Sequence, residues 1–274
     1  MSHAKWRHEQ TFVARRRSRC FRSEVVSRET HGMNEVEALL RQVKMWGLSV
    51  PESVLERLIL YAELMCGYKE ANVIGVHDFR AVLLDHVLDS LSCLLHEPLR
   101  HASNLADIGS GAGLPALPVK LMLPSLRVAM VESNGKKARF LEHAADALDI
   151  SGVEVVAARA EEVGHESSYR EQYDVVTSRA VAPLSILAEY CLPLTRVGGY
   201  VIAMKGTLTP LELTEGENAA GKLGANMVEI IDVPLLSEMR ARNRKLVILE
   251  KVHATPHKYP RRPGMPKKLP LGKK

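Results

Sequence analysis

Three glycines on alternate positions, with a carboxylate just before them, form the stretch of this sequence best suited to chemistry. The segment 107–115 runs Asp-Ile-Gly-Ser-Gly-Ala-Gly-Leu-Pro and follows a short apolar run. Because glycine has no Cβ, a turn built on Gly109, Gly111 and Gly113 can bring the backbone close to a ligand. Asp107 places an acid at the same turn. The pattern is typical of a strand that leads into a nucleoside-binding loop, so a cofactor enzyme is our first hypothesis.

The spacing of these glycines argues against a dinucleotide as the ligand. A dinucleotide loop requires Gly-x-Gly-x-x-Gly, with alanine allowed at the last position. Counted from Gly109, that position holds Leu114, which does not fit. Counted from Gly111 it holds an alanine, but Pro115 then removes an N–H from the phosphate-binding turn. S-adenosyl-L-methionine has no phosphate and needs close approach beside a carboxylate, so it is the predicted cofactor.

Acidic residues follow the next two predicted strands. Glu132 comes about twenty residues after the glycine loop, where a carboxylate can bind both ribose hydroxyls of a nucleoside. The alternative role for Glu132 is a favourable charge at the start of the next helix. Ala160 and Glu161 follow the third strand, where a backbone amide can meet the adenine edge, although Glu161 can equally cap a short helix.

Alternating short apolar runs and helical patterns predict the elements that position these residues. Expected strands are 104–108, 126–131, 153–157, 173–177, 199–204, 227–232 and 245–251, and expected helices are 115–122, 135–148, 183–192 and 209–222. Strands alternating with helices imply right-handed crossovers and a mostly parallel seven-stranded sheet. The last two strands have no helix between them, so one of them is expected to run antiparallel.

The chain divides into four parts by pattern and composition. Apolar residues at spacings of three and four predict three amphipathic helices between Met33 and about Leu95. The residues after 252 combine prolines with Lys and Arg, which predicts an extended segment without a core. The expected parts are a disordered basic extension (1–32), a helical subdomain (33–100), an α/β cofactor-binding domain (101–252) and a basic Pro-rich tail (253–274).

Basic residues are concentrated at the two ends of the chain. Residues 1–32 carry eight Lys and Arg against three Asp and Glu, and residues 251–274 carry eight against none. The body 33–250 has 21 basic and 29 acidic residues and therefore a net charge of −8. Basic ends attract the phosphate backbone of nucleic acids. Solubility alone is the alternative explanation.

The cysteine spacing and the length of the apolar runs exclude several classes of protein. The four cysteines are scattered without a C-x-x-C pair, so neither a disulfide framework nor a metal site is predicted. No apolar run approaches the roughly 20 residues that a membrane-spanning helix needs. We therefore expect a soluble, cytoplasmic protein that does not bind membranes, and we expect a monomer.

Five motifs follow one another along the chain: Asp107–Pro115, Glu132-Ser133-x-x-Lys136-Lys137-x-x-Phe140-Leu141, Arg159-Ala160-Glu161-Glu162, Ser178-Arg179-Ala180 and Met204-Lys205-Gly206. In this order and spacing they resemble the bacterial ribosomal RNA small-subunit methyltransferase G family, also called glucose-inhibited division protein B. The upstream His86-Val87-Leu88-Asp89-Ser90-Leu91 and the tail Pro260-Arg261-Arg262-Pro263-Gly264 match the family as well. The resemblance covers about residues 55–270. One departure is 71–75, Ala-Asn-Val-Ile-Gly, where the family usually has Asn-Leu-Thr.

The resemblance implies an α/β fold of the Rossmann-like class I S-adenosylmethionine-dependent methyltransferases, with an N-terminal helical subdomain. It implies methyl transfer from S-adenosyl-L-methionine to N7 of a guanine in the 530 loop of 16S rRNA, free or in a precursor of the small ribosomal subunit. The residues that it places in the cofactor pocket are Gly109, Leu114, Ala160, Glu161 and Arg179.

For the remaining candidate site residues, the sequence leaves more than one role open. Arg179 follows a strand and can hold a phosphate, the base or the methionine carboxylate, or form a structural ion pair. Lys205, Arg261, Arg262 and the run Arg240–Lys245 are candidates for the RNA backbone, and no residue is assigned a catalytic role. Alternative functions are a methyltransferase for another RNA site, a small molecule or a protein, and a nucleotide-binding regulator without catalysis.

Overall fold

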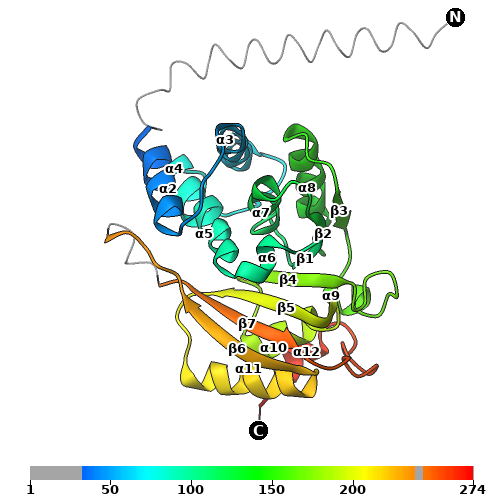
Figure 1. Cartoon of the computed structure of the whole chain (residues 1–274). Coiled ribbons are helices and arrows are strands. Elements are labelled where there is room, and N and C mark those ends of the chain that lie inside the picture. Colours follow the sequence, from blue (N-terminus) through cyan, green and yellow to red (C-terminus); the bar gives the residue numbers. More distant parts are fainter. Residues whose placement is uncertain (1–32, 238–242, 274) are drawn as a thin grey trace, which may run out of the picture.

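The computed structural model describes residues 33–237 and 243–273 of the chain. The predicted extension 1–32, together with Arg240 and Arg242, lies outside the described residues. The strands are β1 (Asn104–Ile108), β2 (Arg127–Val131), β3 (Val153–Val156), β4 (Tyr173–Arg179), β5 (Thr195–Lys205), β6 (Ala225–Asp232) and β7 (Lys245–Lys251). They form one sheet in the order β3-β2-β1-β4-β5-β7-β6 (Figure 1).

The strand directions confirm the expected topology. Strands β1 to β5 are parallel neighbours, so their carboxyl ends meet at one edge of the sheet. Strand β7 inserts between β5 and β6 and runs antiparallel to both. The order reverses at β1, with β2 on one side and β4 on the other. Ligands of open α/β sheets bind outside the carboxyl ends of the strands at such a switch point.

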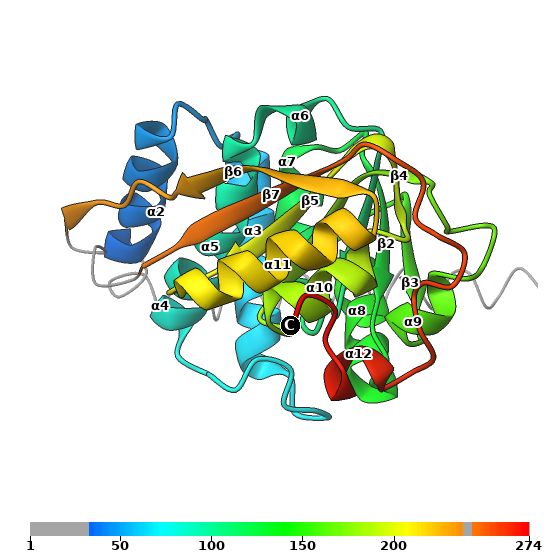
Figure 2. The same ribbon diagram turned by 90° about the horizontal axis from the view of Figure 1, so that it is seen from below.

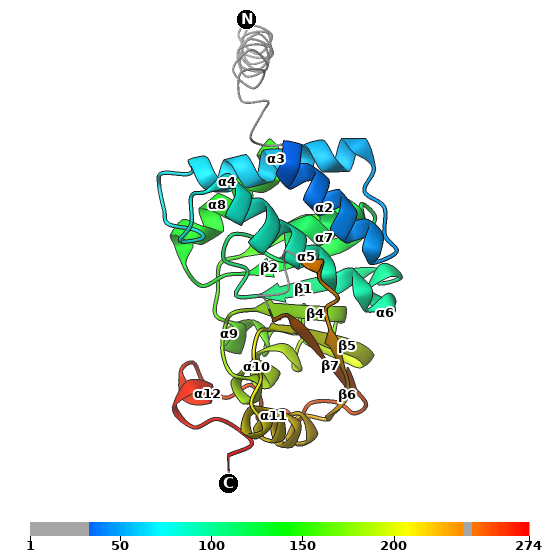
Figure 3. The same ribbon diagram turned by 90° about the vertical axis from the view of Figure 1, so that its left-hand side faces the viewer.

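Helices cover both faces of the sheet, so β1 and β2 are buried along almost their whole length. Figure 3 shows the three layers. On one face lie α2 (Met33–Met45), α3 (Glu52–Gly67), α4 (Phe79–Ala81), α5 (Leu88–Leu91), α6 (Glu97–Arg100), α7 (Ala116–Met122) and α8 (Gly135–Ala147). On the other lie α9 (Ala160–Val163), α10 (Leu184–Cys191) and α11 (Pro210–Lys222), and Figure 2 shows the C-terminal segment with α12 (Met265–Lys268) beside them.

Each face has its own hydrophobic core. The N-terminal helices share one cluster with α7, α8 and the sheet, through side chains such as Leu58, Leu88, Leu117 and Phe140. The second cluster joins the opposite face of the sheet to α10 and α11 and includes Tyr259 from the C-terminal segment. The N-terminal helices therefore pack on the sheet next to α7 rather than standing apart from it.

The third predicted N-terminal helix is broken by a change of helix type. A π-helical turn, η2 (Val82–Val87), stands between α4 and α5, and a 3₁₀ turn, η3 (Ser92–Leu95), follows. π-helical turns are rare and concentrate at functional sites. This one faces the end of β4, because backbone carbonyls of Asp85 and His86 accept hydrogen bonds from Arg179.

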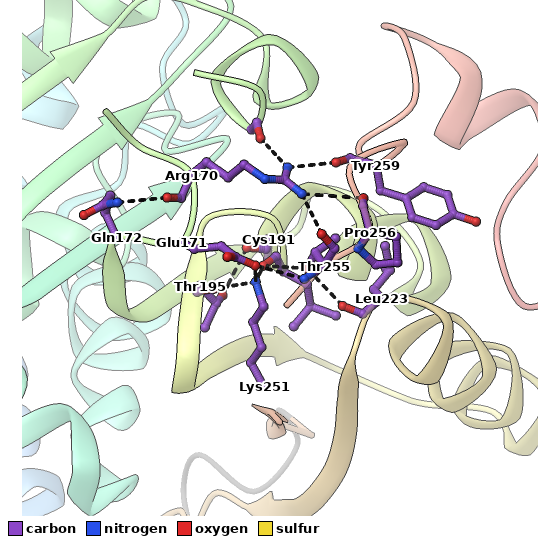
Figure 4. Close-up of polar contacts among 12 residues, drawn as sticks. Arg170, Glu171, Gln172, Cys191, Thr195, Leu223, Lys251, Thr255, Pro256 and Tyr259 are labelled. Carbon is purple, nitrogen blue, oxygen red and sulfur yellow. Dashed lines mark hydrogen bonds and ion pairs between the residues drawn. The ribbon is translucent and has the colours of Figure 1, made fainter. Parts of the chain in front are cut away.

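The expectation of an extended C-terminal tail is wrong. Residues 253–273 are packed on the body, with Thr255 and Tyr259 buried. Arg170 donates to the carbonyls of Thr255 and Tyr259, both at 2.8 Å, and the Glu171 carboxylate accepts from the Thr255 N–H at 2.9 Å (Figure 4). Charged side chains of the body thus form hydrogen bonds with backbone groups of the tail. The composition of the tail alone did not indicate these contacts. No helix in the described part of the chain is long and apolar enough to cross a membrane.

Candidate active site

The glycine loop lies directly after β1, at the switch point of the sheet. Gly109, Gly111 and Gly113 have φ values of 69°, 58° and 90°, in the region that favours glycine. A Cβ on Gly109 would lie 2.6 Å from Val181, and one on Gly113 would lie 2.6 Å from Leu117. A Cβ on Gly111 would meet nothing closer than a carbonyl oxygen at 3.8 Å. Two glycines therefore allow the loop to pack on the protein, and the middle one leaves open space for a ligand.

Glu132, which directly follows β2, is hydrogen-bonded to this loop. One carboxylate oxygen accepts from the Gly111 N–H at 2.9 Å, and the other accepts from the Asn134 N–H at 2.8 Å. The side chain is only 8% exposed. The carboxylate is thus fixed at the carboxyl end of β2 beside the one loop position that is open. Leu114, the last loop residue predicted to line the pocket, is buried in the same region.

Asp107 is a fully buried carboxyl group beneath the loop. Its Oδ1 accepts from the Thr177 hydroxyl at 2.8 Å, whereas Oδ2 has no hydrogen-bond partner among the described residues. Burial raises the pKa of Asp107 from 3.8 to about 6, and the hydrogen bond from Thr177 opposes this rise. A buried acceptor without a donor is costly unless a ligand supplies one. A cationic group at this end of the site would relieve that cost.

This carboxyl gives the ligand-free protein a specific pH dependence. A folded-state pKa above the unfolded value stabilises the fold at low pH, and that stability is lost as pH rises through the folded pKa. A rise from 3.8 to about 6 corresponds to about 3 kcal/mol. We expect Asp107→Asn to remove this part of the pH dependence, so that the free-energy difference between variant and wild type changes between pH 4 and about 7. Urea unfolding across that pH range measures it, and parallel curves for the two proteins would contradict it.

Tyr61 of α3 supports the loop from outside, and the sequence did not single it out. Its hydroxyl donates to the carbonyl of Ala112, and burial raises the pKa of the phenol well above 10. A Cβ on Gly113 would lie 3.0 Å from the same hydroxyl. The neutral phenol therefore holds the loop through a backbone group. Tyr61 occupies an inward position of an amphipathic helix, where a polar aromatic gives no separate signal.

At the end of β3, Glu161 contacts the C-terminal segment. Its Oε1 accepts from the Gly264 N–H at 3.0 Å. Helix capping, the alternative role for Glu161, belongs instead to Glu162, which accepts from the Arg159 N–H at 3.2 Å. Ala160 is half-buried at the first position of α9. Ala160 and Glu161, the residues predicted to face the adenine, thus lie at the edge of the site. Glu161 is hydrogen-bonded to the C-terminal segment.

Arg179 is anchored at the end of β4 by the helical layer. Its guanidinium donates to the carbonyls of His86 and Asp85, both at 3.1 Å, and lies 3.4 Å from the Asp89 carboxylate. Asp89 also accepts from Arg244 at 2.9 Å. The geometry corresponds to the structural ion pair considered for Arg179. Its side chain, 14% exposed, reaches toward η2 and α5.

A family model described as "GidB: rRNA small subunit methyltransferase G" matches residues 54–238. Proteins named ribosomal RNA small subunit methyltransferase G from Rubrobacter xylanophilus and a Roseiflexus species are 52% and 44% identical to this chain. Each alignment covers 86% of the chain, with 90% and 100% of the relative. The chain belongs to this family.

Membership in the methyltransferase G family identifies S-adenosyl-L-methionine as the cofactor, as the glycine spacing predicted. The residues present fit it. The open position at Gly111 admits a ligand close to the backbone, and the carboxylate of Glu132 stands beside it. The buried Asp107 oxygen without a donor suits a cation.

Of the cations predicted to bind RNA, Arg244 and Lys245 are paired with Asp89 and Asp232, and two of the other three are also engaged with carboxylates. Lys205 lies 2.7 Å from Glu212 and donates to the Ala182 carbonyl at 3.1 Å. Arg261 donates to the fully buried Glu189 through Nε at 2.8 Å and Nη2 at 2.6 Å. Arg262 is exposed. Of the three, Arg262 therefore offers its charge most directly to an RNA.

Proposed function

We propose that this protein transfers the methyl group of S-adenosyl-L-methionine to N7 of a guanine in the 530 loop of 16S rRNA. The observation that carries the proposal is the loop at the switch point, where Gly111 leaves space and Glu132 binds the loop amide. Family membership supports the ribosomal RNA as substrate class. The sequence resemblance supports the choice of nucleotide and atom.

The cofactor contacts follow from the placement of the residues. Gly109, Gly111, Gly113 and Leu114 would line the backbone side of the pocket, and Glu132 would bind the ribose hydroxyls. Ala160 would meet the adenine edge from the start of α9. Asp107 would face the positively charged methionine end. Arg179 would line the pocket from its place between the end of β4 and the helical layer.

The cofactor supplies an activated methyl group. Guanine N7 has an in-plane lone pair and no proton to lose, so the chain needs no general base. Its task is to hold the nucleophile in line with the methyl carbon and to exclude water. Glu132 and the glycine loop contribute the fixed geometry, and the buried layer under the loop limits solvent on that side. No residue is assigned as a catalytic acid or base.

The docked C-terminal segment would supply sequence-independent phosphate contacts. Arg262, Lys267 and Lys268 are exposed on it. Lys205 and Arg261 would reach RNA only by leaving Glu212 and Glu189. Guanine N7 lies in the major groove, which is too deep and narrow in A-form RNA for side chains. The target is therefore a loop or a splayed base, in 16S rRNA or a small-subunit precursor. We propose that the protein acts there as a cytoplasmic monomer.

Methyl transfer tests the proposal. Wild-type protein with labelled S-adenosyl-L-methionine should modify 16S rRNA from a strain that lacks the gene, and rRNA from the parent strain should accept little label. Binding to that RNA should weaken as salt increases, since phosphate contacts release counterions. If the protein binds cofactor but labels neither naked rRNA nor subunits from the deletion strain, a different acceptor is indicated.

A further inference from the structure

The C-terminal segment is connected directly to the helix that carries the predicted adenine-side residues. Glu161 of α9 accepts from the Gly264 N–H at 3.0 Å. His165 and the Pro260 carbonyl oxygen are 2.6 Å apart. A Cβ on Gly164, at the end of α9, would lie 2.8 Å from the Pro260 ring. One residue of α9 and the two positions after it thus contact the tail, over a helix of four residues.

A buried charge pair fixes the tail at the same place. Glu189 is fully buried in α10, and it is the one charged residue of that helix. It accepts from the Arg261 backbone N–H at 2.8 Å and from two guanidinium nitrogens at 2.8 and 2.6 Å. Arg261 also donates to the Leu269 carbonyl at 2.8 Å. A buried carboxylate so well matched by one arginine gives the tail a single docked position.

A second group of polar contacts holds the start of the tail (Figure 4). Arg170 donates to the Gly164 carbonyl at 2.8 Å and, with the same guanidinium, to the carbonyls of Tyr259 and Thr255. The Gly164 carbonyl belongs to the end of α9. Arg170 therefore links α9 and the tail through one planar group with a fixed arrangement of donors.

The short helix is held by the body on one side and by the tail on the other: Val163 lies in the second hydrophobic cluster, and Glu161 also interacts with Tyr190 of α10. A four-residue helix is not stable by itself, because helix formation requires longer segments or tertiary packing. Its buried residues are Glu161 and Val163, and Glu161 is the one hydrogen-bonded to the tail. The docking of residues 255–264 therefore adds the Gly264 and Pro260 contacts to those that orient Ala160, at the first position of α9.

We propose that the C-terminal segment 255–264 is a positioning element for the adenine side of the cofactor site, held by the Arg261–Glu189 pair. The inference rests on the proposed function, in which Ala160 and Glu161 face the adenine. Arg261 is then a positioning residue that acts through Gly264 and α9, although its sequence context suggested RNA binding. Its role predicts an effect on cofactor affinity that does not require RNA.

Calorimetry with S-adenosyl-L-homocysteine, in the absence of RNA, tests this on the full chain. We expect Arg261→Ala to weaken binding about tenfold and Arg261→Lys to restore part of the affinity, because lysine keeps the charge but lacks the forked donors. Arg262→Ala is the matched control, since it removes the same charge from the adjacent exposed position. That variant should bind the ligand within twofold of wild type. In methyl-transfer assays, Arg261→Ala should raise the KM for the cofactor more than it lowers kcat.

The outcomes separate the two proposals. If wild type does not bind the ligand, the proposed cofactor function fails. If wild type binds and Arg261→Ala, with an unchanged melting profile, binds equally well, the positioning role is wrong. Equal losses in Arg261→Ala and Arg262→Ala would also overturn it, because they would indicate a general charge effect. Should Arg261→Ala fail to fold, Arg261→Lys decides: it keeps the charge beside Glu189 but loses the forked donors, and an affinity equal to that of wild type would contradict the proposal.

Discussion

Gly111→Val is expected to weaken binding of S-adenosyl-L-methionine by at least about 100-fold, or about 2.7 kcal/mol. Gly111 is the loop position where an added Cβ points into open space, with no atom closer than 3.8 Å. The valine methyl groups would fill the volume that the ligand must enter. The substitution also places a β-branched residue at a φ of 58°, which costs about 1–2 kcal/mol of stability. Calorimetry with the purified variant measures the affinity.

Gly47→Val separates the two effects of that substitution. Gly47 follows α2 and has a φ of 73°, with nothing within 4 Å of an added Cβ. It therefore carries a similar backbone cost at a position far along the chain from the loop. We expect similar losses of melting temperature in both variants and loss of cofactor binding in Gly111→Val alone. Binding within a few-fold of wild type in Gly111→Val would mean that the loop does not approach the cofactor.

Lys251→Met is expected to lower the free energy of unfolding by about 3 kcal/mol, the cost typical of breaking a buried charge pair from one side. The Lys251 side chain is fully buried, and its ammonium donates to Glu171 at 2.7 Å. It also donates to the carbonyls of Leu192 and Thr195 at 2.7 and 2.6 Å (Figure 4). Burial lowers the pKa of this lysine, and the hydrogen bond and charge of Glu171 oppose that change. Methionine fills the volume but removes the ammonium donor from three acceptors, of which the Glu171 carboxylate and the Leu192 carbonyl keep a hydrogen bond from Thr255.

Lys222→Met is the matched control for this prediction. Lys222 is exposed at the end of α11, so the same change of side chain should alter stability by no more than about 0.5 kcal/mol. Urea denaturation of both variants provides the comparison. A loss of less than 1 kcal/mol in Lys251→Met would show that the ammonium group contributes little net stability beyond the packing of its stem.

The sheet was predictable because its signals are local. Each strand from β1 to β7 is a short apolar run, and the crossover helices carry their own periodicity. The missing helix after β6 indicated that one of the last two strands runs antiparallel, and the structure shows that this strand is β7. The π-helical turn Val82–Val87 was not predictable, because its apolar spacing resembles that of an α-helix. Its hydrogen bonds to Arg179 come from a strand more than 90 residues away.

The proximity of Gly111 and Glu132 was predictable for the same reason. Gly111 and Glu132 follow adjacent strands, and the parallel sheet brings the ends of such strands together. The ion pairs of the arginines and lysines were not predictable, because the sequence does not indicate which partner a charged side chain contacts in the fold. Arg261 pairs with Glu189, 72 positions earlier. One hint existed in the partner: Glu189 stands alone as a charge in the apolar helix Leu184–Cys191.

Mapping the modified nucleotide identifies the guanine and the atom that receive the methyl group. 16S rRNA from a deletion strain is incubated with the protein and S-adenosyl-L-methionine, treated with borohydride and aniline, and copied by reverse transcriptase. That treatment cleaves RNA at N7-methylguanine. We expect one new reverse-transcription stop at a guanine of the 530 loop, present with the wild-type protein and absent with Gly111→Val. An rRNA that acquires labelled methyl groups without any cleavage, or with cleavage elsewhere, would contradict this expectation.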